Sequence, residues 1–156
     1  MRKILGLMLG VGMAMAQQVE VTAERFLASE STQKATFAGK VKVTKGTDVL
    51  TSDTLVIYFN AKKEPLKYEA TGNAKANITM NEVRYFASGE TLTYDPVALI
   101  YTVKTNGFLH EIDTDRKVYG ELITVNQAQG NYEVDSKANA PVKFIFQMNS
   151  KEEKAQ

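Results

Sequence analysis

Apolar and polar residues alternate with a period of two along most of the chain. In the run at residues 37–44, Val41 and Val43 take one side while Lys40 and Lys42 take the other. This period is typical of β-strands with one buried face. Similar runs occur at 55–59, 92–94, 99–103, 123–125 and 142–146. Clusters of turn-forming residues separate the runs, and no stretch has the period of an amphipathic helix. The pattern therefore predicts an all-β chain of many short strands.

The apolar side of each run predicts which residues face the interior of the fold. A one-residue slip in a strand would turn every side chain to the other face, so the assignment is specific. The predicted interior residues are Phe37, Val41, Val43, Leu55, Ile57, Phe59, Leu92, Tyr94, Ile123, Val125, Phe144 and Phe146. The neighbouring Lys40, Lys42 and Lys143 are expected to face solvent. Such an interior can be a packed core or an apolar groove for acyl chains, and the alternation fits both.

Two short units recur along the chain. The first reads Ala-Glu-Arg-Phe at 23–26, Ser-Asp-Thr-Leu at 52–55, Gly-Glu-Thr-Leu at 89–92 and Gly-Glu-Leu-Ile at 120–123. The second is a glycine followed by alternating residues, at 39–43 and 72–76 with a looser third copy at 107–112. Repeats of roughly 30 residues indicate stacked supersecondary units. They favour an open stack of two facing layers over a closed barrel.

The first unit carries one acid in each copy: Glu24, Asp53, Glu90 and Glu121. Paired carboxylates can hydrolyse glycosides, but equivalent positions in a repeat indicate one shared structural role. We expect these acids to bond turn amides.

The first residues have the pattern of an export signal. Arg2 and Lys3 precede an apolar run of about 12 residues, which is shorter than the roughly 20 that a transmembrane helix needs. Ala14-Met15-Ala16 matches a cleavage site, so we expect a signal peptide at 1–16, a single domain at 17–148 and a polar tail at 149–156. The chain has no cysteine, which excludes a lipoprotein anchor and disulfides.

Little in the sequence points to catalysis or to a bound ion. The chain has one histidine, His110, so His/Cys metal sites and Cys-His catalysis are not expected. The acidic turn Asp113-Thr114-Asp115 lacks the pattern of a calcium loop. We predict no catalytic residues, no metal and no cofactor. The formal net charge of +1 stays close to zero after loss of Arg2 and Lys3, which does not favour nucleic-acid binding.

Residues 36–58 carry a family resemblance. They read Gly-Lys-Val-Lys-Val, a turn, and then Ser-Asp-Thr-Leu-Val-Ile-Tyr, which resembles the repeated G-x-V-x-V and A-D-x-L-x-x-Y units of the OstA/LptA-like family of periplasmic lipopolysaccharide-transport proteins. Residues 69–74 and 89–95 look like the next copies, and the resemblance covers about residues 19–146. The chain departs from the family pattern at Ser52, where alanine is common, and at Ser88-Gly89-Glu90.

The resemblance implies an open two-sheet β-jelly roll, folded like a taco shell, in the periplasm. The interior would take the acyl chains of lipid A in lipopolysaccharide during transport from the inner to the outer membrane. Its edges would pair head to tail with further copies, or with the inner-membrane-anchored and outer-membrane jelly-roll transport proteins. The cleavable signal fits the soluble bridge component. The expected unpaired edges lie near 19–26 and 142–146, without an internal proline.

Two other functions remain open at this stage. One is a structural or adhesive exported β-repeat protein with a packed core and no lipid ligand. The other is an extracytoplasmic glycan hydrolase or lectin, for which surface aromatics and a carboxylate pair in a cleft would be expected.

Overall fold

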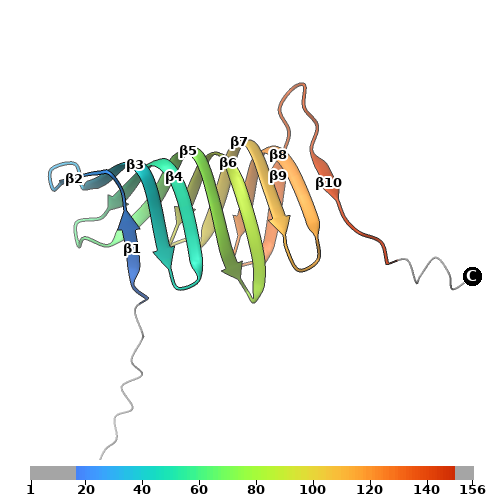
Figure 1. Cartoon of the computed structure of the whole chain (residues 1–156), viewed down its shortest axis with the longest axis horizontal. Helices are drawn as coiled ribbons and strands as arrows, with labels where there is room; N and C mark the ends of the chain where they lie inside the picture. The colour runs from blue at the N-terminus through green and yellow to red at the C-terminus, as the bar shows by residue number, and fades with distance from the viewer. Residues whose placement is uncertain (1–16, 150–156) are drawn as a thin grey trace, which may run out of the picture.

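The computed structural model describes residues 17–149, so the predicted signal peptide and nearly all of the polar tail lie outside the described residues. Within that range every regular element is a strand, which confirms the all-β prediction. No helix there is long and apolar enough to cross a membrane. The strands are β1 Val19–Thr22, β2 Arg25–Ser29, β3 Lys34–Lys45, β4 Asp48–Phe59, β5 Pro65–Met80, β6 Val83–Asp95, β7 Ile100–Glu111, β8 Arg116–Asn126, β9 Asn131–Asp135 and β10 Lys143–Ile145 (Figure 1).

All ten strands belong to one antiparallel sheet. Its order is β1-β3-β4-β5-β6-β7-β8-β10, with β2 paired to β3 and β9 paired to β8. The N-terminal strands therefore lie at one end of a long stack and the C-terminal strands at the other (Figure 1). From β2 to β9, each strand pairs with the strand that follows it in sequence, whereas β1 pairs with β3 and β10 with β8.

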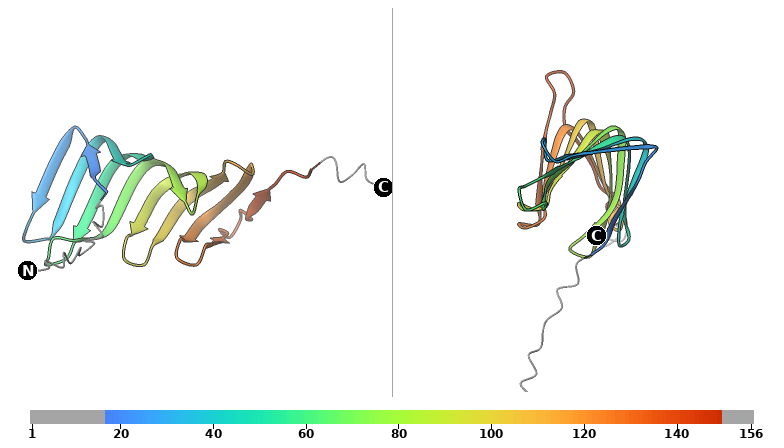
Figure 2. Two further views of the ribbon diagram at one scale, coloured as in Figure 1. Left: turned by 90° about the horizontal axis from the view of Figure 1, so that it is seen from below. Right: turned by 90° about the vertical axis from the view of Figure 1, so that its left-hand side faces the viewer.

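The sheet bends sharply along a line that crosses the middle of the strands. Viewed along the stack, the strands form an arch (Figure 2, right). The bend divides the sheet into two facing arms. Arm A consists of β1, β10 and residues 41–52, 74–89 and 107–120; arm B consists of β2, β9 and residues 34–38, 54–71, 91–104 and 122–126. The expected two layers are thus two halves of one hydrogen-bonded sheet, open along one side.

β-Bulges produce this bend. The register between β3 and β4 shifts after Ala38, where Gly39 and Lys40 both have positive φ angles of 81° and 48°. The pairs Gly72-Asn73 in β5 and Thr105-Asn106 in β7 repeat this conformation at equal spacing along the chain. An extra residue in one strand of a pair bends that strand locally, so one bulge per repeat bends the whole stack.

The third copy of the glycine unit was placed incorrectly from the sequence. Gly107 follows the bulge in β7 and does not form it; the residues equivalent to Gly39 and Gly72 begin at Thr105. Thr105 and Asn106 take the left-handed conformation without glycine, so the glycine pattern alone could not locate this copy.

The repeated acids lie along the bend. Glu24 and Asp53 are close to Gly39 and Gly72, where a Cβ atom would collide with their carboxylates. Glu121 accepts a hydrogen bond from the Thr105 hydroxyl at 3.2 Å, a side-chain donor where we had expected a turn amide. These acids therefore occupy a shared structural position beside the bulges.

Substitution of Gly72 tests the role of the bend. Gly72→Ala is expected to reduce the free energy of unfolding by roughly 2–3 kcal/mol, because alanine is strained at a φ of 88° and its Cβ would displace the Asp53 carboxylate. Gly130→Ala is the matched control: φ is 69°, but nothing lies within 4 Å, so a loss of about 1 kcal/mol is expected. Urea unfolding measures both, and equal losses would contradict the proposed packing at the bend.

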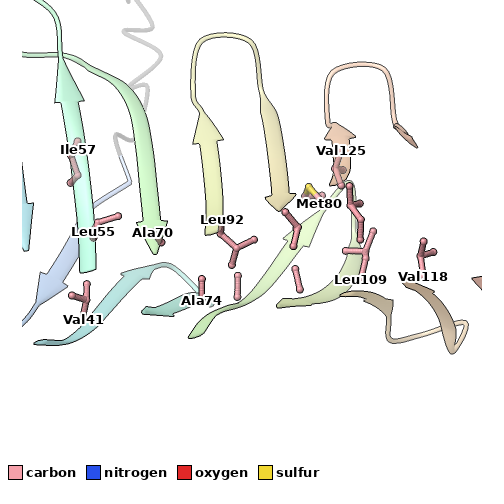
Figure 3. Packing of buried hydrophobic residues seen from close by; sticks show 14 of the residues in the cluster. Val41, Leu55, Ile57, Ala70, Ala74, Met80, Leu92, Leu109, Val118 and Val125 are labelled. Atoms are coloured by element: carbon pink, nitrogen blue, oxygen red, sulfur yellow. The ribbon is translucent and has the colours of Figure 1, made fainter. Parts of the chain in front are cut away.

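The core lies between the two arms. Leu55, Ile123, Val41 and Val103 are its largest fully buried side chains. Figure 3 shows Val41, Leu55, Leu92 and Leu109 within this space. At the bend, the inward side changes between even and odd positions in β4, β6 and β8, which lack the extra residue, whereas β3, β5 and β7, which contain it, keep the inward side on the same positions. In β4, Leu50 and Ser52 face inward before the bend and Leu55 and Ile57 after it.

Candidate functional site

The predicted interior residues line the space between the arms along most of the stack. Those that are buried in the core are Val41, Leu55, Ile57, Leu92, Ile123 and Val125. Phe37, Val43 and Phe59 are partly buried against them. Tyr94 lines a cavity in the same space. These residues come from β3, β4, β6 and β8, so the lining is continuous across the stack.

Phe144 and Phe146 lie at the open end of this space. Phe144 pairs with the inward-facing Val118, so it shares the inward side of arm A. However, Phe144 is 49% exposed and Phe146 57%, because among residues 17–149 no strand pairs beyond β10 and arm B ends at β9. Their rings stack on each other with centroids 5.5 Å apart. The two phenylalanines therefore extend the apolar face without being enclosed by it, unlike the other predicted interior residues.

The lysines between these residues lie outside the arch. Lys40 and Lys42 are exposed on β3. Lys143 lies over the ring of Tyr119, 4.8 Å from its centroid, on the outer side of arm A.

The space between the arms holds cavities of different size. Near the N-terminal end lies an open apolar cavity of about 370 Å³. Further along, a small enclosed cavity of about 50 Å³ is lined by residues that include Ala70, Ala76, Met80 and Ala87. The first volume is in the range of small-molecule sites, whereas the second is too small for a ligand of that kind.

Several lining residues were missed from the sequence. Leu50, Tyr68, Ile78 and Tyr101 line the larger cavity together with the predicted Leu55. Leu50 faces inward on an even position of β4, before the inward side changes to the odd positions of Leu55 and Ile57. Ile78 lies in β5, where the inward side stays on even positions. The alternation Ala74, Ala76, Ile78, Met80 in β5 was the available signal, but alanines gave it little hydrophobic contrast.

A pair of tyrosines lies where the two cavities meet. The rings of Tyr94 and Tyr101 stack with centroids 4.2 Å apart and an interplanar angle of 19°. Both rings line both cavities. Burial raises the pKa of both phenols, and the neighbouring Tyr94 raises the pKa of Tyr101 further.

The burial of Tyr101 predicts a pH dependence of stability. A phenol whose pKa is raised in the folded state contributes its full stability below its unfolded pKa of about 10 and loses it as pH rises toward the folded pKa. We expect the free energy of unfolding to fall above pH 10 by up to about 1.4 kcal/mol per pH unit for this group. Tyr101→Phe should remove that part of the slope in urea titrations. An unchanged slope in the variant would show that Tyr101 is not buried.

Polar contacts lie toward the C-terminal end of the interior. The Asn81 amide of arm A donates to the backbone carbonyl of Gln127 in arm B at 3.4 Å, across the open side. Glu111 is buried, with 8% exposure, and pairs with Arg116 at 2.8 Å. A cavity of about 340 Å³ lies among these residues. The interior is therefore apolar along most of its length and has a polar section near β7 and β8.

The polar residues considered for catalysis are paired with each other. His110 contacts Asp115 at 2.8 Å. Arg84 forms an ion pair with Asp113 at 2.6 Å, and its hydrogen bonds hold the Asp113 pKa below the ordinary value. Over residues 17–149, no cluster of three or more His, Cys, Asp or Glu side chains could hold a metal ion.

An antiparallel sheet folded over an open apolar interior is an open β-jelly roll. The family model for the LptA/(LptD N-terminal domain) LPS transport protein matches residues 20–131, so the chain belongs to that family of transport proteins. No curated protein sequence gave a significant match.

A solved structure supports the fold independently. The chain is similar to LptH of Pseudomonas aeruginosa, described as the LptA homologous periplasmic component of the conserved lipopolysaccharide transport device. The TM-score is 0.74 at 16% identity, and the match covers 85% of this chain and 96% of that one. This match confirms the expected jelly-roll fold, and the family model confirms the expected family.

Proposed function

We propose that the protein is a periplasmic carrier that shields the acyl chains of lipopolysaccharide between the inner and outer membranes. The observation that carries this proposal is the continuous apolar lining between the arms, with an open cavity of about 370 Å³ at its N-terminal half. Membership of a lipopolysaccharide-transport family supports the same ligand.

The physical task of such a carrier is to keep hydrocarbon out of water. Exposure of an acyl chain costs about 0.8 kcal/mol for each CH₂ group, which amounts to a large barrier for several chains. An apolar groove lowers this cost without any covalent step. Binding therefore requires shape and apolar surface, which the interior provides.

The two ends of the stack support a bridge made of several jelly rolls. Phe26 at the N-terminal end is 59% exposed and pairs with the inward-facing Phe37, while Phe144 and Phe146 are exposed at the C-terminal end. In the part of the chain that the structure describes, the strands at these ends, β1 with β2 and β9 with β10, each have a neighbour on one side only. Addition of a strand from another copy, or from a membrane-bound jelly-roll partner, would bury these rings and extend the groove.

A protein with a packed core and no ligand is the alternative. The small enclosed cavity beside Ala70 and Ala87 favours a packed core in the middle of the stack, where the arms pack closely. In the carrier, by contrast, acyl chains must part the arms there.

Co-purification tests the carrier against this alternative. The protein is expressed in a Gram-negative host, purified without detergent and assayed for bound lipopolysaccharide by mass spectrometry. The carrier predicts near-stoichiometric lipid that is removed by denaturation. Protein that is folded and free of lipid under these conditions would favour the packed core.

A further inference from the structure

Two cavities of opposite character share a wall near the open side of the arch. The apolar cavity of about 370 Å³ is lined mainly by Val, Leu, Ile and Tyr side chains. A second cavity of about 350 Å³ is lined mainly by polar residues, which include Gln17, Thr47, Thr79 and Gln127. Residues that line both are Lys45, Asp48, Tyr94, Leu99 and Tyr101. An apolar space that opens into a polar one matches the two parts of an amphiphile.

Lys45 is the one cation among the described residues that line these two cavities. It lies at the end of β3, two residues beyond the inward-facing Val43, and pairs with Val19 of β1. Within residues 17–149 no ion pair involves Lys45. Its ammonium group is thus available to an anion that enters the polar cavity.

Asp48 is close by but has other partners. Its Oδ1 accepts a hydrogen bond from the Thr79 amide at 2.9 Å. Its charge also acts on the phenols of Tyr94 and Tyr101, whose pKa values it raises in addition to burial. The cavities around this lysine also contain a carboxylate, two phenols, two threonine hydroxyls and two side-chain amides, which can pair with sugar hydroxyls. The lysine supplies the positive charge that an anion requires.

We propose that Lys45 binds a phosphate on the sugar headgroup of an acylated ligand whose chain occupies the apolar cavity. This inference rests on the proposed function, because it requires that the apolar cavity holds an acyl chain. The lysine fixes where the headgroup lies along the groove, since a charge-assisted bond forms at that position. It makes the site selective for phosphorylated amphiphiles over neutral ones.

Binding of two amphiphiles with the same chain tests the proposal. Dodecyl phosphate and dodecyl maltoside, both below their critical micelle concentrations, are titrated calorimetrically into the purified protein. Lys45→Gln is expected to lower the affinity for dodecyl phosphate about tenfold and to leave the affinity for dodecyl maltoside unchanged. Lys45→Arg should keep the affinity for dodecyl phosphate, because arginine keeps the positive charge.

Lys42→Gln is the matched control. Lys42 is on the same strand but exposed on the outer face, so its removal changes the net charge equally without reaching either cavity. It should leave both affinities unchanged. Inorganic phosphate should not displace dodecyl phosphate at equal concentration, because it gains nothing from the apolar cavity.

Three results would overturn the inference. Equal losses in Lys45→Gln and Lys42→Gln would show a general charge effect, and displacement by inorganic phosphate would show a free-phosphate site. Normal binding of dodecyl phosphate to Lys45→Gln, with dodecyl maltoside also bound, would show that Lys45 does not bind the phosphate. It would leave the proposed carrier function standing. Binding of neither amphiphile to the unmodified protein would reject the carrier as well.

Discussion

Replacement of Leu50 with aspartate is expected to reduce co-purified lipopolysaccharide at least tenfold. Leu50 lines both the apolar cavity and the small enclosed cavity, so a charge there would lie against the acyl chains. An unpaired charge in an apolar site is strongly unfavourable, and each 1.4 kcal/mol lost is a factor of ten in affinity. Leu50 is only partly buried, so the fold should survive the change better than it would at Leu55.

Thr51→Asp provides the control for this experiment. Thr51 is the next residue of β4 and is exposed on the outer face, so aspartate at this position adds the same charge outside the groove. Lipid content should be normal in this variant. Circular dichroism and urea unfolding must show both variants folded. A folded Leu50→Asp protein with normal lipid, or equal losses in the two variants, would contradict a lipid-binding interior.

Charges at the two ends of the stack are expected to abolish growth of oligomers with protein concentration. Phe26→Asp places a charge on the inward face of β2, and Phe144→Asp does the same on β10. A head-to-tail contact joins unlike surfaces, so each variant loses one end and keeps the other. Each alone should sediment as a monomer, and an equimolar mixture should form dimers but nothing larger.

Leu27→Asp controls for charge on the same edge. Leu27 follows Phe26 in β2 and is 60% exposed on the opposite face, so oligomers should still grow. A mixture of the two end variants that stays monomeric would contradict the head-to-tail arrangement. Oligomers of either variant alone that reach the size formed by the unmodified protein would also contradict this arrangement.

The alternation of side chains made most of the fold predictable. Val41, Leu55 and Ile123 were placed in the interior because strand periodicity is local and the sheet pairs strands that are neighbours in sequence. The repeat then indicated an open stack. Both signals depend on contacts close in sequence, which a single chain reveals without further information.

The bend and its consequences were harder to predict. At Thr105-Asn106 a bulge forms without glycine. In β4 the inward side changes at the bend, which hid Leu50, and in β5 the alternating alanines gave little contrast, which hid Ile78. The exposure of Phe144 depends on where the opposite arm ends, a property of the assembled stack rather than of β10. The polar cavity at Lys45 joins turns from both arms, and no local pattern marks such a site.

Site-specific photo-crosslinking in living cells tests the central claim most directly. A photoreactive residue at Val43, which lines the apolar cavity, is compared with one at Lys42, the adjacent residue on the outer face. The carrier predicts a lipopolysaccharide adduct from position 43 and none from position 42. Adducts of equal yield from both positions, or none from position 43 in a folded protein, would contradict the claim that lipid travels between the arms.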